Sequence, residues 1–221
     1  MSVETKHEYE FEALADIHLF YPVANNLVPV FRKLGVTPNM ITTLSLISTI
    51  YAFMKLNTNK NEAIVAYLLG YLFDTMDGAM ARKYKMGSEF GMTYDMVTDT
   101  VSNILILYLM FTKEELPMEI KILLVVLILA LMMYNGLIEA QCSFRDDGHD
   151  NFYKTKYEIY KNSNSFMTKL YLKIEKSNYD FYKKFMPKYN DKKVKSMLKN
   201  LKIVGPGNFC LIMVYLMYKY F

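Results

Sequence analysis

Four aspartates and an arginine lie inside segments that otherwise have the composition of membrane helices. On each of two predicted helices, acidic and small residues share one stripe about 100° wide. The stripes are Asp74, Asp77, Gly78 and Ala81, at positions i, i+3, i+4 and i+7, and Gly91, Asp95, Asp99 and Ser102, at i, i+4, i+8 and i+11. If the two helices are consecutive and antiparallel, these stripes face each other.

Four carboxylates in one place cannot all stay ionised without a counter-charge, because repulsion and low dielectric favour protonation. One or two divalent cations supply that charge, and carboxylate oxygens suit hard ions such as Mg²⁺ or Mn²⁺. Gly78, Ala81 and Gly91 leave room for a bulky ligand. Arg82 follows the first stripe and is placed to bind phosphate. Together these features predict phosphoryl or phosphodiester transfer.

Two other interpretations of the acidic residues remain open. The aspartates can be buried groups paired with Arg82 and Lys83, or they can form a proton or cation pathway in a transporter. Each fixed residue is expected at only about one position in ten to twenty by composition. Transfer chemistry is therefore the leading hypothesis.

The composition of the whole chain predicts the elements that hold these residues. Of 221 residues 52% are hydrophobic, with 17 Met, 19 Tyr, 14 Phe and no Trp. Several apolar runs reach the roughly 20 residues that span a bilayer once their flanks are included. We expect an all-α, polytopic integral membrane helix bundle of about five to six spans. The five spans that can be counted are 40–56, 62–84, 89–111, 119–140 and 208–221.

The N-terminal region is predicted to be a tail and an amphipathic helix that lies on the membrane. Residues 11–34 carry apolar side chains on one side but also two prolines and a polar centre. Gly35 is expected to end this helix, Thr37 to cap the next one and Pro38 to occupy its first turn. The acidic start of the chain does not resemble a cleavable leader, so the first span is expected to act as its own insertion signal.

The stretch 145–202 is basic, with 15 Lys or Arg against 7 Asp or Glu and with aromatic residues in between. No part of it can cross a bilayer cheaply. We expect one or two basic amphipathic helices attracted to anionic headgroups. Nucleic acid is an alternative partner that nothing else in the chain supports, so none is expected. Gly205-Pro206-Gly207 should then break the helix.

These segments give an expected organisation in four parts. They are a tail and interfacial helix at 1–36, a catalytic transmembrane core at 37–142, a basic cytosolic or interfacial segment at 143–204, and a C-terminal transmembrane helix at 205–221. If the spans alternate, most basic residues fall on one side of the membrane. That side should be cytosolic, and the aspartates lie at that end.

The acidic residues carry a resemblance to a known family. Asp74-x-x-Asp77-Gly78-x-x-Ala81-Arg82, eight residues, and then Gly91-x-x-x-Asp95-x-x-x-Asp99 match the signature of the CDP-alcohol phosphotransferase (CDP-alcohol phosphatidyltransferase) family. The segment TPNMIT at 37–42 is similar to the family's N-terminal stretch, and the resemblance covers about residues 30–140. It implies a membrane enzyme that moves a substituted phosphate from a CDP-linked donor to an alcohol, releasing CMP and making a phospholipid.

Position by position, the resemblance implies three tasks: metal binding, proton removal and donor binding. Asp74, Asp77 and Asp95 hold two metal ions that bridge the donor diphosphate, and Asp99 lies near the metals and takes the proton from the attacking hydroxyl. The residues implied for the donor are Gly78, Ala81, Arg82, Gly91 and Asn39.

The substrate is less constrained. In one branch of the family CDP-diacylglycerol gives its phosphatidyl group to a polar alcohol, and in the other CDP-choline or CDP-ethanolamine gives its head group to diacylglycerol. The compact length favours the first. Asn135, Glu139 and Arg145, near the cytosolic end of the fourth span, are candidates for the acceptor site because polar residues in a span are costly. They can equally be helix-end residues that face headgroups.

Family members usually have six spans, whereas five are counted here, and the stretch 145–202 occupies the place of another. Members are also commonly dimeric, which adds a second copy to the expected partners: the CDP-linked donor, the alcohol or lipid acceptor and membrane lipids.

A non-catalytic membrane scaffold of the same fold is a third function class beside the transferase and the transporter.

Overall fold

The computed structural model describes residues 10–143, 160–185 and 191–221, and every element in these ranges is helical. A π-helical turn (Asp16–Phe20) leads into α1 (Tyr21–Lys33). Four long helices follow: α2 (Pro38–Lys55), α3 (Lys60–Lys83), α4 (Glu89–Thr112) and α5 (Met118–Ser143). The described chain ends with α7 (Phe166–Phe185), α8 (Asp191–Leu201), a 3-10 turn (Lys202–Val204) and α9 (Pro206–Tyr220). The expected all-α class is confirmed.

Local signals in the sequence set the helix boundaries. The Thr37 hydroxyl accepts a hydrogen bond of 3.4 Å from the first turn of α2, and Pro38 is the first residue of that helix, as predicted. Gly35 ends the preceding helix with a φ of 78°, which a glycine adopts at little cost. The side chains of Asn59 and Ser88 cap α3 and α4 in the same way. Helices α2 to α5 therefore coincide with the first four expected spans to within a few residues.

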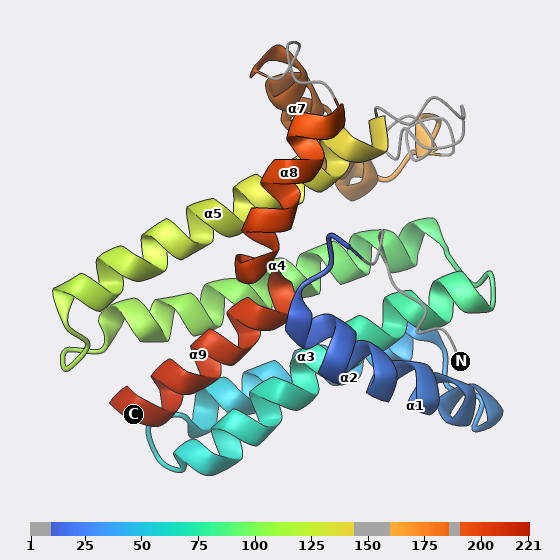
Figure 1. Ribbon diagram of the computed structural model, residues 1–221. Coiled ribbons are helices and arrows are strands. Elements are labelled where there is room, and N and C mark those ends of the chain that lie inside the picture. The colour runs from blue at the N-terminus through green and yellow to red at the C-terminus, as the bar shows by residue number, and fades with distance from the viewer. Residues whose placement is uncertain (1–9, 144–159, 186–190) are drawn as a thin grey trace.

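Helix α3 lies at the centre of the bundle and packs against α1, α2 and α9, while α2 also packs against α4. Helices α3 and α4 run antiparallel and are joined by a short turn (Figure 1). The backbones of α2 and α3 come close because Gly70 has no side chain: a Cβ there would lie 2.8 Å from Oγ1 of Thr49. Ser45 Oγ donates to the Gly70 carbonyl at 2.9 Å. Such contacts between small residues are typical of packed membrane helices.

The connecting loops lie at two opposite ends of the bundle. At one end the Arg32 guanidinium lies 5.8 Å from the centroid of the Tyr84 ring, so the ends of α1 and α3 meet. At the other end Lys60 Nζ donates to the Tyr218 carbonyl at 2.9 Å, so the start of α3 meets the end of α9. This arrangement agrees with the alternation assumed from the sequence.

The N-terminal helix is fastened to α9 and α3 by buried polar groups. The Asp16 carboxylate accepts hydrogen bonds from the Tyr71 hydroxyl at 2.8 Å and from the Gly207 N–H, in the first turn of α9, at 3.0 Å. A carboxylate at a helix N-terminus is favourable, because the unpaired N–H groups and the helix dipole attract negative charge. Asn208 Oδ1 in turn accepts from the Ala15 N–H at 2.9 Å. The amphipathic segment is thus helical as expected, and its location on a membrane surface stays a prediction.

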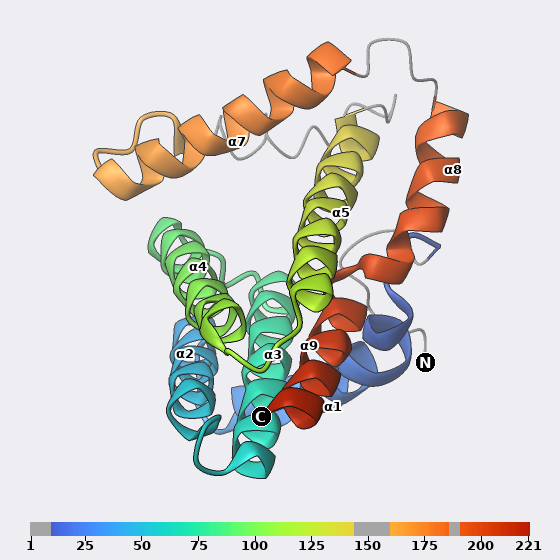
Figure 2. The same cartoon turned by 90° about the vertical axis from the view of Figure 1, so that its left-hand side faces the viewer.

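The described part of the basic stretch forms two helices, α7 and α8. Helix α8 buries Val194 and Leu198 against Tyr134 and Leu137 of α5 and against Phe11. Helix α7 lies across the axes of α3 and α4, as the two perpendicular views show (Figures 1 and 2). The 3-10 turn and the extended Gly205 then separate α8 from α9, as the Gly-Pro-Gly sequence predicts.

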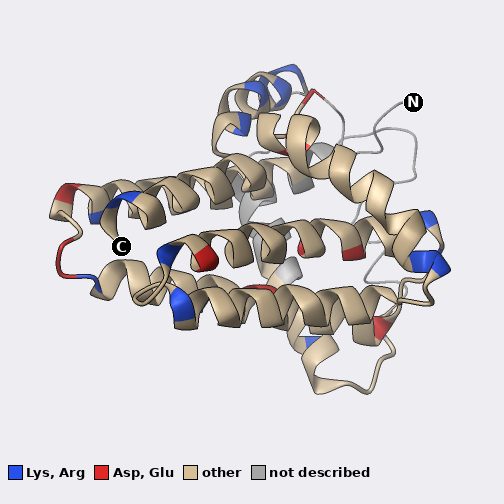
Figure 3. Ribbon diagram, turned by 90° about the horizontal axis from the view of Figure 1, so that it is seen from below, with Lys and Arg blue, Asp and Glu red and all other residues tan. Residues whose placement is uncertain are grey.

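In the described ranges, two segments are long and apolar enough to cross a bilayer: Met118–Ile138 in α5, and Lys192–Tyr220, which includes α9. Helices α2, α3 and α4 are long enough, but their polar and charged residues keep them outside these two candidates. Most of the length of these helices is uncharged, and the blue Lys and Arg positions gather toward the helix ends (Figure 3). The count of five spans stays a prediction.

Candidate active site

Aspartates from both stripes meet between α3 and α4. One carboxylate oxygen from each of Asp74, Asp95 and Asp99 lies within 4.8 Å of the other two. The three oxygens fit the preference of Mg²⁺ and Mn²⁺ for hard oxygen ligands.

Asp77 belongs to the same stripe of α3 but is held by α2. Its side chain is buried, and Oδ2 accepts a hydrogen bond of 2.6 Å from the Thr42 hydroxyl. It is not one of the three residues whose oxygens converge within 4.8 Å. Asp74 and Asp95 are nevertheless near enough to interact with it electrostatically. Its role as a metal ligand stays a prediction.

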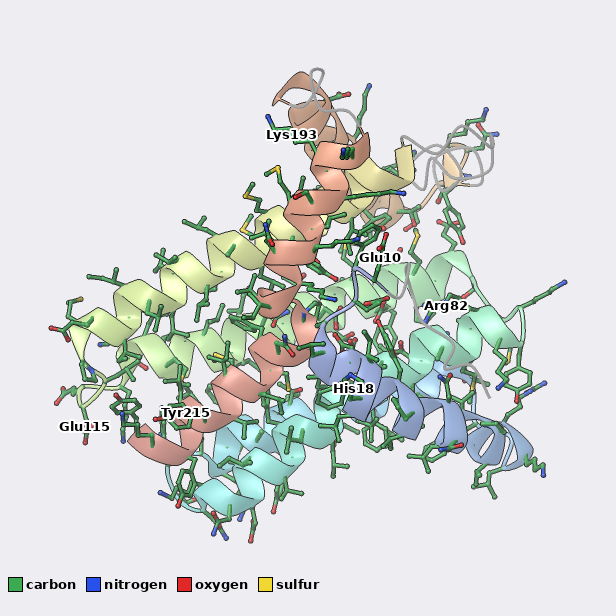
Figure 4. The ribbon with its side chains drawn as sticks, viewed as in Figure 1. Glu10, His18, Arg82, Glu115, Lys193 and Tyr215 are labelled. Atoms are coloured by element: carbon green, nitrogen blue, oxygen red, sulfur yellow. The ribbon has the colours of Figure 1, made fainter. Side chains whose placement is uncertain are left out.

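Arg82 folds back along α3 toward the aspartates. A Cβ on Gly78 would lie 3.1 Å from Nη1 of Arg82, so the guanidinium rests over the glycine, one helical turn earlier. Arg82 lies near the end of α3 that leads into α4 (Figure 4). Ala81, the other small residue of the stripe, is half-buried beside it. The missing side chain at Gly78 therefore gives the positive charge a place next to the acidic stripe.

The first turns of α2 and α4 also meet. A Cβ on Gly91 would lie 2.8 Å from Oδ1 of Asn39, so two residues that the sequence assigned to donor binding are neighbours. One turn further along both helices, Thr43 Oγ1 and the Tyr94 hydroxyl are 3.0 Å apart. Helix α2 thus contacts both helices that carry the aspartates.

Sequence reasoning did not single out Thr42, Thr43 or Tyr94. Adjacent threonines near the start of an apolar helix are a signal that could have drawn attention to Thr42 and Thr43. No spacing rule links Thr43 to Tyr94 or Thr42 to Asp77, because the partners lie on different helices.

A second polar group fastens α7 to the start of α4. Oε1 of Glu89 accepts hydrogen bonds from the hydroxyl of Thr168, at 2.7 Å, and from that of Ser163. The hydroxyls of Thr93 and Thr168 are 3.3 Å apart, and Thr168 is fully buried. This contact holds α7 against the first turns of α4, on a different face of that helix from Asp95. No pattern in the sequence indicates this contact.

The acceptor candidates are not joined to this site by any contact in the described ranges. Asn135 is exposed on α5, a helix that packs mainly against α7, α8 and the 3-10 turn. The side chain of Glu139 and the whole of Arg145 lie outside the described residues.

One turn beyond Asp99, the Oγ of Ser102 is buried and has no hydrogen-bond partner among the described groups.

Comparison with known proteins finds one family profile and several relatives. A sequence profile of the CDP-alcohol phosphatidyltransferase family matches residues 35–149. A CDP-diacylglycerol–inositol 3-phosphatidyltransferase of Candida albicans is 36% identical over 73 residues, which are 33% of this chain and 32% of that protein. A probable enzyme of the same name from Arabidopsis thaliana is 30% identical over 112 residues, 49% of each chain. An uncharacterised protein of Aquifex aeolicus is 38% identical over 80 residues, covering 36% of this chain and 41% of that protein.

These alignments span between a third and a half of the relatives' length, and none of the solved structures matches the chain. The family profile covers just over half of the chain and includes every residue from Asn39 to Arg145 considered above. The chain belongs to the CDP-alcohol phosphatidyltransferase family.

Proposed function

We propose that this protein is a metal-dependent phosphatidyltransferase that moves a substituted phosphate from a CDP-linked donor to an alcohol and releases CMP, in phospholipid biosynthesis. The observation that carries the proposal is the convergence of Asp74, Asp95 and Asp99 within 4.8 Å. Family membership supports the reaction class. A transporter does not need Arg82 folded over Gly78, or Asn39 against Gly91.

Asp74, Asp95 and Asp99 would hold the metal, with Asp77 available as a further ligand. Two ions are proposed, because a diphosphate offers oxygens on both phosphates. When bound, such ions polarise a phosphoryl oxygen and stabilise negative charge on the leaving group. The carboxylates need this counter-charge themselves, because three of them lie close together and repel one another.

The residues around Gly78 and Gly91 would bind the CDP-linked donor. Arg82 would pair with the diphosphate, since a guanidinium donates in a planar fork that matches phosphate oxygens. Arg82 now lies over Gly78 and would turn toward the diphosphate when the donor binds, so that the bare backbone at Gly78 and the small Ala81 would leave space for the flat cytidine. Asn39 would hold the opposite side from the first turn of α2.

Asp99 is proposed as the general base. It would accept the proton of the acceptor hydroxyl as that oxygen forms a bond to the phosphorus and the bond to the CMP oxygen breaks. CMP then leaves with its phosphate, and the new phosphodiester stays in the lipid. A positioned base contributes about 10²- to 10⁴-fold to such a step.

CDP-diacylglycerol is the favoured donor, because two relatives are named as enzymes that use it with inositol. A polyol such as inositol is therefore the first acceptor to test. The acceptor roles of Asn135, Glu139 and Arg145 stay predictions. The alternative is the branch in which CDP-choline or CDP-ethanolamine reacts with diacylglycerol.

We also propose that the bundle is embedded in a membrane, with the aspartates at the cytosolic side. Large apolar residues remain more than half exposed on each of the five helices proposed to span: Ile47, Val65, Ile104, Leu129 and Tyr215 are examples. Large apolar side chains at these exposed positions would be buried among acyl chains if the helices cross a bilayer. Arg32, Tyr84 and the basic turn after Arg82 lie together at one end, which the positive-inside rule makes cytosolic.

The test is CMP release by the purified protein in detergent with Mn²⁺. CDP-diacylglycerol is offered with a panel of polar alcohols, and CDP-choline and CDP-ethanolamine are offered separately with diacylglycerol. CMP from one pair identifies the reaction and its branch. If folded protein releases no CMP with any pair, the transferase assignment is wrong for these donors, and a scaffold of the same fold becomes the better explanation.

A further inference from the structure

Helix α7 has a buried face and an exposed apolar face. Thr168, Tyr171 and Leu172, at i, i+3 and i+4, are buried, and the contacts of this helix are with α5 and α4. A second stripe is apolar but exposed, at i, i+4 and i+8: Phe166 is 75% exposed, Leu170 38% and Ile174 47%. Such a stripe has no partner within the described chain, although burying it would be favourable.

Lysines line the border between these two faces. Lys169, Lys173 and Lys176 stand at i, i+4 and i+7 and are all exposed. An apolar stripe beside a row of lysines is the pattern of a helix that lies in a lipid interface, with the stripe among the acyl chains and the ammonium groups near anionic headgroups.

The orientation of α7 fits such an interface. The helix runs across the axes of α3 and α4, so it lies parallel to the membrane surface if those helices cross the bilayer (Figure 2). Its first turn is held to α4 by Glu89, through Thr168 and Ser163. That contact occupies the buried side of α7 and leaves the apolar stripe facing away from it.

We propose that α7 docks on an anionic lipid leaflet through Phe166, Leu170 and Ile174, with Lys169, Lys173 and Lys176 contacting the headgroups. This inference rests on the proposed membrane location but not on the proposed reaction. Charge complementarity selects anionic lipid as the occupant. A protein partner, including a second copy of this chain, is an outcome that the test separates.

The chain has no Trp, so a single introduced Trp reports on one site alone. Phe166→Trp places it in the exposed stripe of α7. The full-length protein is reconstituted in nanodiscs of phosphatidylcholine, with or without phosphatidylglycerol, and with acyl chains that are plain or brominated. A Tyr215→Trp variant, on the exposed face of α9, shows whether the bundle itself is embedded in the lipid.

We expect the Phe166→Trp emission to move to shorter wavelength, and to be quenched by brominated chains, when phosphatidylglycerol is present. Replacing all three α7 lysines, Lys169→Gln, Lys173→Gln and Lys176→Gln, should abolish both effects. High salt should weaken them, because it screens the headgroup charge. The control removes the same charge from α8 with Lys192→Gln, Lys193→Gln and Lys195→Gln, and should leave both effects in place.

Three outcomes would overturn the proposal while Tyr215→Trp is quenched normally. The Trp at 166 can stay unquenched in both lipids, which means that α7 does not dock. It can be quenched equally with and without phosphatidylglycerol, which removes the role of the lysines. It can already be blue-shifted in detergent in a manner that depends on protein concentration, which means that a second copy covers the face. Loss of quenching at Tyr215→Trp as well would instead contradict the membrane location on which the proposal rests.

Discussion

The hydroxyl of Thr42 on α2 donates to Oδ2 of Asp77 on α3 at 2.6 Å, and both side chains are buried. This bond ties the acidic stripe of α3 to the helix that also contacts the start of α4. It gives Asp77 a neutral hydrogen-bond donor, whereas Asp74, Asp95 and Asp99 face mainly one another.

Thr42→Val should weaken the site, because Asp77 loses a buried hydrogen bond to a charged group, worth about 2 kcal/mol. We expect kcat/KM for CMP release to fall roughly 30-fold, which is the same free energy expressed as a rate ratio. Thr42→Ser keeps the hydroxyl and should retain most of the activity. Equal losses in the two variants would mean that packing of the methyl group, and not the hydrogen bond, matters here.

Asp99→Asn should lower turnover by about 10²- to 10⁴-fold, because the amide cannot accept the proton of the attacking hydroxyl. Binding of the CDP-linked donor should persist, since Asp74 and Asp95 remain. CMP release measures the first effect, and binding of a labelled donor by protein in detergent measures the second. Full turnover in this variant would show that another group is the base.

Metal removal should both inactivate and destabilise the protein. EDTA is expected to abolish CMP release, and Mn²⁺ or Mg²⁺ should restore it. In the absence of substrate, Mn²⁺ at about 100 times its Kd should stabilise the fold by about 2.7 kcal/mol. That raises Tm by about 5 °C or more for a chain of this size. Asp95→Asn should reduce this rise in Tm. If Mn²⁺ does not change the Tm of the unaltered protein, these carboxylates do not hold a metal.

Gly91→Ala should impair donor binding more than folding. The new methyl group would lie 2.8 Å from Oδ1 of Asn39, and the amide can turn away from it at small cost. Losing one polar contact of about 1 kcal/mol raises KM for the donor by roughly three- to tenfold. Asn39→Ala should reproduce this change. The matched control is Gly87→Ala, where no heavy atom lies within 4 Å of the added carbon, and it should leave KM unchanged.

Glu89→Ala should release the first turn of α7, because Ser163 and Thr168 lose their shared acceptor. Hydrogen exchange is expected to become faster over residues 163–172, while α2 and α3 keep their protection. Glu119→Ala removes an acidic residue from the first turn of α5 and serves as the control. Unchanged exchange at α7 would mean that its packing on α5 alone holds it in place.

Much of the fold could be predicted because local chemistry sets it. The left-handed glycine at 35 ends one helix, and the Thr37 cap and Pro38 begin the next, because each acts through its own backbone or nearest neighbours. Asn59 and Ser88 cap α3 and α4 in the same local way. The helical spacing of Asp74, Asp95 and Asp99 was likewise sufficient to expect their convergence once α3 and α4 were taken as antiparallel neighbours. The number of spans was harder to predict, because α2, α3 and α4 contain the polar residues of the site among their apolar ones.

Contacts between residues distant in the chain could not be predicted in this way. The hydrogen bond that the Gly207 N–H donates to Asp16 joins segments 191 residues apart. The Glu89 contact with Thr168 joins two helices that have α5 and residues 144–159 between them in the chain. Periodicity describes one helix at a time. It says nothing of which faces of two separate helices meet.

The sequence by itself determined the helices, the chemistry of the acidic stripes and the family, because the spacing of a few residues along a regular helix fixes which of them share a face. Only the tertiary structure decided that Asp77 bonds to Thr42 while Asp74, Asp95 and Asp99 converge, and that Glu89 fastens α7 to the start of α4. The physical reason is that these choices depend on how helices pack, and packing is settled by side-chain shape across the whole bundle.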